Sequence, residues 1–397
     1  VTGVRLMVGD CDPSLFADSL RARDICGIDS VEDFWPAAAS IAEWRRAVSD
    51  GRLAGPRVVA ASILFDGPRP CWPGSYTLTD PDTARARVRE AQRRGVDFIK
   101  VYNCSLSRDV YLAIADEARQ IGIPFAGHTL AEVGWAEAAA LGHKSIEHVS
   151  MLMAQCTTAP EEVVAARQRW NRERTAATGR ALGELVFRTF SVDRCAPMIA
   201  ALRAHGTAFV PTLAVADLDR FTPAILDDSD PRLRYLMPPL RDRWRRGNAG
   251  IRNVPPEDFE GQRRNFERWH SAITAMERAG VLILAGSDAL NAAVFPGFSL
   301  HDELALLVRA GLSPLAALQA ATMRPARFFG IEDQLGTIEA GKQADLVLLD
   351  RNPLENIRNT TTVHAVIAAG RLFDRAALDA LLASAAAAAE LRVRPPE

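Results

Sequence analysis

Short apolar runs alternate with longer amphipathic segments along most of the chain. The runs are rich in β-branched side chains and are bounded by turn-forming residues, a pattern typical of buried strands. They span Val4–Val8, Arg57–Leu64, Val96–Val101, Ile123–His128, Lys144–Val149, Ala208–Leu213 and Val281–Ala285. We expect a strand at each of these runs.

The segments between the runs predict helices. Three of them end within two residues of a glycine: Pro81–Arg94, Ser107–Gln120 and Leu130–Leu141. Strands and helices in alternation indicate a parallel sheet with right-handed crossovers, covered by helices. We therefore predict an α/β fold, a (β/α)8 barrel of the TIM type. Seven strands are visible, and the first of the eight is expected before Val1.

Connections that follow the predicted strands are long, whereas those that precede them are short. The long ones are Gly9–Ala39, Phe65–Asp80, Ser150–Asp193 and Ala214–Glu260. Because active sites of such barrels lie at the C-terminal ends of the strands, these insertions are expected to wall a substrate pocket. Within the last insertion, Asp230–Arg246 is either a solvated helical excursion or a substrate lid.

The segment after Pro314–Arg324, the last predicted barrel helix, has a different pattern. Asp345–Leu349 and Val363–Ala368 are short strand-like runs, and two or three strands need a partner sheet. We expect a small β-sandwich remnant whose other strands precede Val1. The predicted domains are the barrel at 1–330, the sandwich strands at 331–374 and a C-terminal helix at 375–397.

Composition and charge exclude several classes of partner. The 397 residues are 48% hydrophobic and 24% charged, as expected of a well-cored soluble chain. A net charge of -2 provides no field that attracts nucleic acid or an anionic membrane, and no apolar run reaches the roughly 18 residues of a membrane helix. A small-molecule or dipeptide substrate is expected. The chain begins almost inside a predicted strand, without an initiator Met or a signal segment, and we expect a segment before Val1. The compartment, cytoplasmic or exported, therefore stays open, as does a homo-oligomeric state.

The cysteines are scattered along the chain. They are Cys11, Cys26, Cys71, Cys104, Cys156 and Cys195, with no C-x-x-C pair. This spacing argues against a zinc knuckle and against a disulfide framework. We expect ordinary buried or loop thiols.

Four residues that could bind a metal lie at the ends of four apolar runs: Lys100, His128, His148 and Asp288. In a barrel these strand ends meet at one mouth, so the four side chains could surround an ion. His128 and His148 are one βα unit apart and suit a divalent metal. Asp288 suits both metal ligation and general-base chemistry. Taken singly, each would be a structural histidine or a loop-capping aspartate.

Lys100 is unusual because burial opposes its charge. Reaction with CO2 would turn its amine into a carbamate anion able to bridge two metals. A Lys–Asp ion pair across the barrel mouth is the alternative. For the substrate, we expect an apolar wall from Trp72, a polar contact from Tyr102 with Asn103, and a contact from His301, which would otherwise cap its helix.

The motifs around these residues resemble the amidohydrolase superfamily, specifically its imidazolonepropionase-like and prolidase-like branch. The matching stretches are GVDFIKVY, PFAGHT, KSIEHVS, GSDAL, HDELALLVRAGLSPLAALQAAT and LGTIEAGKQADLVLLDRNPL. The resemblance implies a distorted (β/α)8 barrel, a sandwich built from both termini and a binuclear hydrolytic centre, usually of zinc. It also implies that Lys100 is the bridging carbamate, that His128 and His148 bind the second metal, and that Asp288 binds the first metal and acts as general base.

One part of the family pattern is absent. The first barrel strand of the family ends in His-x-His, and no two of the seven histidines here are two positions apart. The expected function is hydrolysis of a C–N amide bond, in a dipeptide, an N-acyl amino acid or a cyclic amide, by metal-bound hydroxide. One alternative is a ligand-binding barrel without catalysis, because the His-x-His pair is lacking. The other is a mononuclear deaminase, although Glu132 falls four residues after His128 rather than two or three.

Overall fold

The structure is a computed structural model that describes residues 45–390, except 49, 53, 54, 73, 174, 253–255 and 290. The predicted strand Val4–Val8 and the insertion Gly9–Ala39 lie outside the described residues, as do Cys11 and Cys26.

A parallel six-stranded sheet holds most of the predicted strands. Its members are β1 (Phe65–Asp66), β2 (Tyr76–Thr77), β3 (Ile99–Val101), β4 (Phe125–Gly127), β5 (His143–Glu147) and β6 (Ala208–Val210), in the order β2-β1-β3-β4-β5-β6. A further parallel bridge joins Phe209 to Ile283, which places the run Val281–Ala285 beside β6. The α/β class and the parallel sheet are thus confirmed, whereas closure into an eight-stranded barrel stays a prediction.

Two strands differ from the sequence pattern. Within the run Arg57–Leu64 the structure has a bridge from Ala61 to Phe98 and a hydrogen bond from the Tyr76 amide to the Leu64 carbonyl, but β1 begins only after the run, at Phe65. The prediction of a strand over that whole run was therefore wrong. β2 lies inside the insertion after β1 and pairs with it through Phe65 and Tyr76. A strand of two residues is too short to produce a period, so the pattern missed it.

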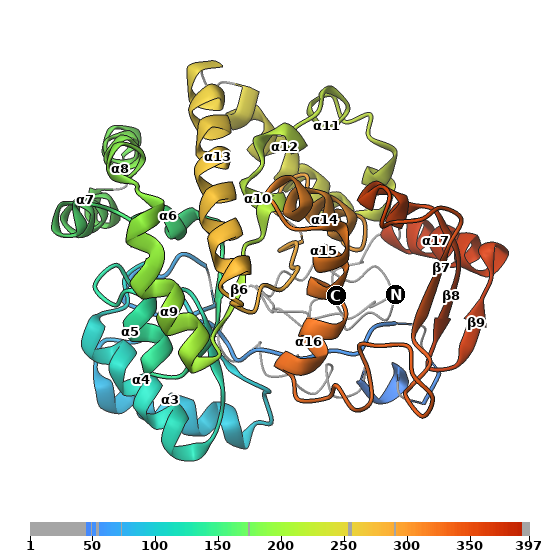
Figure 1. The fold of residues 1–397 in the computed structure, drawn as a ribbon, viewed down its shortest axis with the longest axis horizontal. Coiled ribbons are helices and arrows are strands. Elements are labelled where there is room, and N and C mark those ends of the chain that lie inside the picture. Colours follow the sequence, from blue (N-terminus) through green and yellow to red (C-terminus); the bar gives the residue numbers. More distant parts are fainter. Residues whose placement is uncertain are drawn as a thin grey trace, which may run out of the picture.

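Helices follow the strands and cover the sheet (Figure 1). They are α3 (Pro81–Arg93), α4 (Arg108–Ile121), α5 (Trp135–Ala140), α9 (Ala196–His205), α13 (Pro256–Arg278), α14 (Ser299–Arg309), α15 (Pro314–Ala320) and α16 (Met323–Phe328). Ser107 caps α4 by accepting a hydrogen bond from the Val110 amide, and Gly122 ends it with a φ of 72°. The predicted helix Leu130–Leu141 begins only at Trp135, because the preceding residues form a turn.

The long insertions after β5 and β6 contain helices of their own. They are α6 (Leu152–Gln155), α7 (Pro160–Glu173) and α8 (Ala176–Thr189), then α10 (Leu213–Ala216), α11 (Pro223–Leu226) and α12 (Pro238–Arg252). The segment Asp230–Arg246 is not a purely solvated excursion: Leu233, Leu240 and Trp244 are buried in one cluster with Phe295.

The C-terminal segment forms a separate antiparallel sheet, β7 (Leu346–Leu349), β8 (Val363–Ala368) and β9 (Arg371–Phe373), followed by α17 (Arg375–Glu390). β7 and β8 confirm the two predicted runs, and β9 was not expected. In Figure 1 this sheet and α17 lie at the opposite side of the molecule from α3 and α4. The sandwich and the domain boundaries stay predictions.

The core has two large parts. One packs β3 and β4 against α3 and α4, with Ile99, Val88 and Ile114 fully buried. The other surrounds β5, β6 and α13, and includes Trp135 and Phe209, whose ring centroids lie 5.1 Å apart. Among the described residues, no helix combines the length and the apolar character needed to cross a membrane.

Two disulfides contradict the expectation of free thiols. Cys71 is bonded to Cys104, with Cα atoms 5.6 Å apart, and Cys156 is bonded to Cys195, with Cα atoms 4.6 Å apart. The partners are 33 and 39 residues apart in sequence. The insertions after the strands bring them together, and spacing along the chain carries no trace of that.

Candidate active site

The structure brings the four predicted ligands to one region, with Lys100 close enough for its charge to act on His128 and Asp288. His128 directly follows β4, His148 directly follows β5, and Asp288 follows the Ile283 bridge by five residues. The rings of His128 and His148 meet edge to face, with centroids 4.7 Å apart. His148 Nδ1 lies 3.9 Å from a carboxylate oxygen of Asp288.

Hydrogen bonds fix which nitrogen of His128 is available. The Asn103 side-chain amide donates to the Thr129 carbonyl at 2.9 Å, which turns Asn103 Oδ1 towards His128 Nδ1 at 3.1 Å. That oxygen can only accept, so Nδ1 carries the proton and Nε2 presents its lone pair. His128 Nε2 is buried and has no hydrogen-bond partner among the described residues.

The electrostatics keep His128 in its neutral form. Burial lowers the pKa of His128 well below its usual value, and the nearby His148 and Lys100 lower it further. A neutral imidazole with a buried, unpartnered Nε2 is the form that binds a divalent metal.

Lys100 pairs with Glu147 rather than with an aspartate. Its Nζ lies 2.9 Å from Glu147 Oε2, and each side chain is only 4% exposed. Burial opposes the ionisation of Glu147, but Lys100 and a hydrogen bond from Ser145 outweigh it and lower the pKa of Glu147. Glu147 is a site residue that sequence reasoning missed. The available signal was its place directly before His148 at the end of a strand.

Asp288 is partly buried and close to both members of this pair. Burial raises the pKa of Asp288 to about 6; the positive charge of Lys100 opposes that rise and Glu147 adds to it. Asn291 donates a hydrogen bond of 2.8 Å to its carboxylate. A carboxylate whose pKa lies near neutral pH is well matched to proton transfer.

Unusual backbone conformations gather around these side chains. His148, Thr212 and Asp288 have φ values of 72°, 47° and 51°, a region that residues with a Cβ rarely adopt. Thr212 is also a direct neighbour of the site, since its hydroxyl lies 2.7 Å from His148 Nδ1. Such strain is typical of functional sites, where the surrounding structure holds the chain in place. It has no signature in the sequence.

A pocket of about 530 Å³ opens beside the two histidines. Tyr102, His128, Glu147 and His148 line it, together with residues of α7 such as Arg167 and Trp170. This placement agrees with the expectation that the insertion after β5 walls the pocket.

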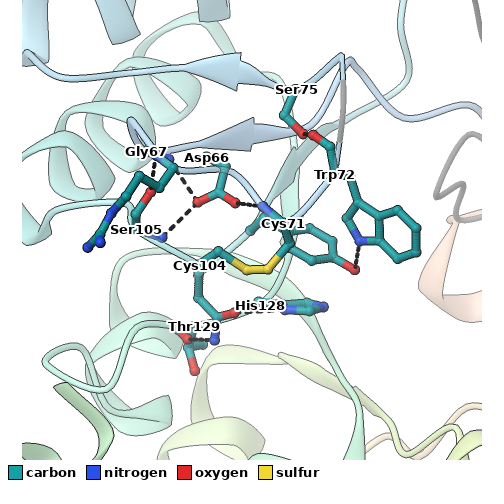
Figure 2. Close-up of a disulfide and its surroundings, with 12 residues drawn as sticks. Asp66, Gly67, Cys71, Trp72, Ser75, Cys104, Ser105, His128 and Thr129 are labelled. Carbon is teal, nitrogen blue, oxygen red and sulfur yellow. Dashed lines mark hydrogen bonds between the residues drawn. A yellow bond between two sulfur atoms is a disulfide. The ribbon is translucent and has the colours of Figure 1, made fainter. Parts of the chain in front are cut away.

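The three residues predicted to contact the substrate, Tyr102, Trp72 and His301, differ in their position relative to this pocket. The Tyr102 ring packs on His128, with centroids 4.0 Å apart, and lines the pocket. Trp72 lies behind Tyr102 and contacts it rather than the pocket: its indole N–H donates to the Tyr102 hydroxyl at 3.0 Å (Figure 2). His301 is not brought to this pocket, because its Nδ1 lies 3.0 Å from the Thr360 hydroxyl near the C-terminal sheet.

The predicted metal ligands fit a divalent ion in type. They offer two imidazoles, one of them with an orphaned nitrogen, and a carboxylate. However, the ligand atoms of His128, His148 and Asp288 do not all lie within 4.8 Å of one another. Among the described residues, the group of three whose ligand atoms all lie within 4.8 Å of one another is Asp66, Cys71 and Cys104, where the cysteines are disulfide-bonded.

The fold is similar to solved structures of amidohydrolases and prolidases. The structure titled bottromycin amidohydrolase matches with a TM-score of 0.66 and 23% identity, over 91% of this chain and 76% of that one. A Xaa-Pro dipeptidase with methionine bound in its active site matches with a TM-score of 0.54 and 22% identity, over 84% and 72%. A prolidase from Bifidobacterium longum, described as putative in its title, matches with a TM-score of 0.54 and 25% identity, over 87% and 74%.

Sequence comparison gives shorter matches. The chain is 32% identical over 88 residues to a 5-methylthioadenosine/S-adenosylhomocysteine deaminase of Teredinibacter turnerae, and 30% identical over 106 residues to an adenine deaminase of Roseobacter denitrificans. These matches span 20% and 26% of this chain, and only 20% and 17% of the relatives' own lengths. Residues 260–373 match the sequence model of the amidohydrolase family, and the fold of the chain is similar to that of solved amidohydrolase structures.

Proposed function

We propose that the protein is a metal-dependent hydrolase that cleaves a C–N amide bond in a dipeptide, an N-acyl amino acid or a cyclic amide. One observation carries the proposal: the buried Nε2 of His128 has no hydrogen-bond partner among the described residues, and the His128 ring meets that of His148, which lies near Asp288. Both histidines line a substrate-sized pocket. Similarity to a Xaa-Pro dipeptidase and a bottromycin amidohydrolase supports this class of reaction.

Each residue of the site has a separate proposed role. His128, His148 and Asp288 would hold a divalent metal, expected to be zinc, with a second zinc in a binuclear centre. When bound, the metal supplies Lewis acidity. Asp288 takes the proton of the attacking water and delivers it to the leaving nitrogen. Tyr102 and the residues of α7 hold the substrate around the reacting bond.

Lys100 has two roles open to it. As a protonated amine it neutralises Glu147, as in the present structure. As a carbamate it would bridge two metals: its neutral Nζ forms a bond to the carbon of CO2 and releases a proton. The second role requires Lys100 to leave Glu147, because two buried anions side by side repel each other.

Metal analysis and a substrate panel test the proposal. We expect about two zinc ions per chain after loading with zinc, and release of a free amine from at least one class among dipeptides ending in proline, N-acyl amino acids and cyclic amides. A chelator should abolish turnover and added zinc should restore it. If the chain retains no zinc after this treatment and turns over none of the substrates, the result would instead favour a binding protein without catalysis.

A deaminase is the second candidate, because the two curated relatives described above are named as deaminases of adenine or adenine-containing compounds. Glu132 lines the same pocket as His128 and accepts a hydrogen bond from Gln168 on α7. Adding adenine and 5-methylthioadenosine to the panel separates the two functions. Release of ammonia from these compounds, with no cleavage of the amides, would favour the deaminase.

A further inference from the structure

The disulfide between Cys71 and Cys104 borders the candidate site, and both residues line the same pocket as His128. Cys71 is exposed and Cys104 is 7% exposed. The second disulfide differs in its surroundings, because Cys156 and Cys195 are both completely buried in the large core cluster.

The exposed disulfide joins two segments that leave neighbouring strands. Cys71 follows β1, and Cys104 follows β3 (Figure 2). The Asp66 carboxylate sits between these segments and accepts hydrogen bonds from the amides of Cys71 at 3.2 Å and Ser105 at 3.1 Å. Gly67 approaches the Ser105 carbonyl so closely that a Cβ would lie 2.0 Å from its oxygen. The two segments are therefore fastened to each other beside the pocket.

The fastened segments carry the residues that surround His128. On one segment, Trp72 follows Cys71 and donates to the Tyr102 hydroxyl. On the other, Tyr102 and Asn103 precede Cys104. Tyr102 packs on the imidazole of His128, and Asn103 accepts from its Nδ1. The disulfide therefore links the two segments that carry the contacts from Trp72 to Tyr102 and from Tyr102 and Asn103 to His128, a predicted metal ligand.

We propose that Cys71 and Cys104 are positioning residues: their disulfide holds Tyr102 and Asn103 against His128, and its reduction frees the imidazole and weakens metal binding. Reduction by a dithiol such as dithiothreitol breaks the S–S bond and forms two S–H groups. The dithiol supplies two electrons and two protons and becomes a cyclic disulfide. The metal-binding part of this inference rests on the proposed function.

The same structure predicts which disulfide reacts first. Exchange requires the attacking thiolate to reach a sulfur atom. Cys71 is exposed, whereas Cys156 and Cys195 are completely buried, so a low concentration of reductant should open the Cys71–Cys104 bond alone. Alkylation of the freed thiols followed by peptide mass spectrometry identifies the bond that has opened.

Zinc affinity is the first readout, measured by competition with a chromogenic chelator. We expect the C71S/C104S variant and the selectively reduced wild type to bind zinc about 10- to 100-fold more weakly, the loss typical of outer-shell partners of a metal ligand. The matched control C156S/C195S should lose thermal stability and keep its zinc affinity. An affinity within about twofold of wild type in C71S/C104S, or an equal loss in both variants, would overturn the proposal.

Nitrogen-15 NMR of His128 in the metal-free protein is the second readout, with the signal assigned through His128→Gln. The oxidised protein should show the Nδ1-protonated form, and reduction should add the other tautomer. Tyr102→Phe, which removes the bond to Trp72 but keeps the ring, should give a smaller change and needs no altered cysteine. An unchanged spectrum after verified reduction contradicts the positioning role even if the chain binds no zinc.

These outcomes separate the inference from the proposed function. Absence of zinc from the oxidised wild type counts against the hydrolase, whereas an unchanged His128 signal counts against the disulfide. If zinc binds only after reduction and is lost in Asp66→Asn, the ion lies on Asp66 and the two thiolates, and the positioning role is wrong.

Discussion

At the scale of single residues, buried charges define the candidate site. Lys100 and Glu147 neutralise each other at 2.9 Å, and both act on Asp288. His128 is neutral because burial disfavours its charged form, and the positive charge of Lys100 adds to that effect. These side chains come from different strands, so each one depends on the others for its charge state.

Asp288→Asn tests the general base. The amide cannot take a proton from water, so turnover should fall by roughly 10²-fold or more. Zinc content should fall much less, because His128 and His148 remain. Steady-state kinetics and metal analysis on the same preparation check this, and a turnover near that of wild type would remove Asp288 from the proton-transfer role.

Lys100→Ala tests the carbamate. If Lys100 bridges two metals, the variant should lose metal-dependent hydrolysis, and a short carboxylic acid such as acetate should restore part of it by occupying the place of the carbamate. Turnover is measured with and without acetate, and Asp288→Asn serves as a control that acetate should not rescue. Near-full activity without acetate would contradict the bridging role.

Lys100→Met tests the ion pair in the metal-free protein. It leaves a buried Glu147 carboxylate without its partner, which should lower the free energy of unfolding by about 3 to 5 kcal/mol. The double variant Lys100→Met/Glu147→Gln removes both charges and should regain most of that loss. Urea unfolding of the three proteins gives the comparison, and equal stability of the single and double variants would argue against the pair.

At the scale of elements, the ends of the strands determine where the ligands point. Gly127 is the last residue of β4, with a φ of 121°, and a Cβ there would lie 2.4 Å from the Val101 carbonyl oxygen on β3. Only glycine allows β4 to lie this close to β3 and still turn into His128. Gly127 thus determines where the following residue, His128, lies.

Gly127→Ala should therefore damage both stability and zinc binding. Gly122→Ala is the matched control, because Gly122 also has a positive φ, of 72°, but nothing within 4 Å of the added Cβ. The control should lose only about 1 kcal/mol from the backbone conformation, and Gly127→Ala should lose clearly more because the backbone must shift. Thermal unfolding and zinc competition measure both effects, and equal losses in the two variants would refute the steric argument.

At the scale of the whole molecule, the insertion after β6 is joined to the C-terminal half through a buried acid. Glu303 on α14 is fully buried and accepts a hydrogen bond of 2.7 Å from the Ala214 amide of α10. Burial raises the pKa of Glu303 from 4.5 to about 8. The folded chain therefore holds this proton more tightly than the unfolded chain does.

This difference predicts how stability depends on pH. A raised carboxyl pKa stabilises the fold fully below the unfolded value near 4.5, and the contribution is lost as pH rises towards 8. Wild type should lose stability relative to Glu303→Gln between these values, because glutamine does not titrate. Urea unfolding of the metal-free proteins at several pH values measures the difference, and a constant difference would contradict the raised pKa.

Much of this architecture is predictable from local pattern. Alternating apolar runs and glycine-terminated segments located β3 to β6 and α3 and α4, and the positions of His128, His148 and Asp288 after apolar runs indicated their common location. The pattern missed β2 and β9 because, unlike the equally short β3, β4 and β6, they do not lie within a longer apolar run. Sequence analysis missed Glu147 because a single acidic residue in an apolar strand looks the same in the sequence whether it belongs to an active site or only stabilises the fold.

The sequence by itself determined the parallel α/β class, the resemblance to a superfamily and the strand ends at which the candidate ligands lie, since these depend on residues close together in the chain. Only the tertiary structure decided that Lys100 pairs with Glu147, that a buried nitrogen of His128 has no hydrogen-bond partner among the described residues, and that Cys71 meets Cys104. These are contacts between residues 25 to 47 positions apart. They arise when the strands align, because the parallel register sets which side chains share the same end of the sheet.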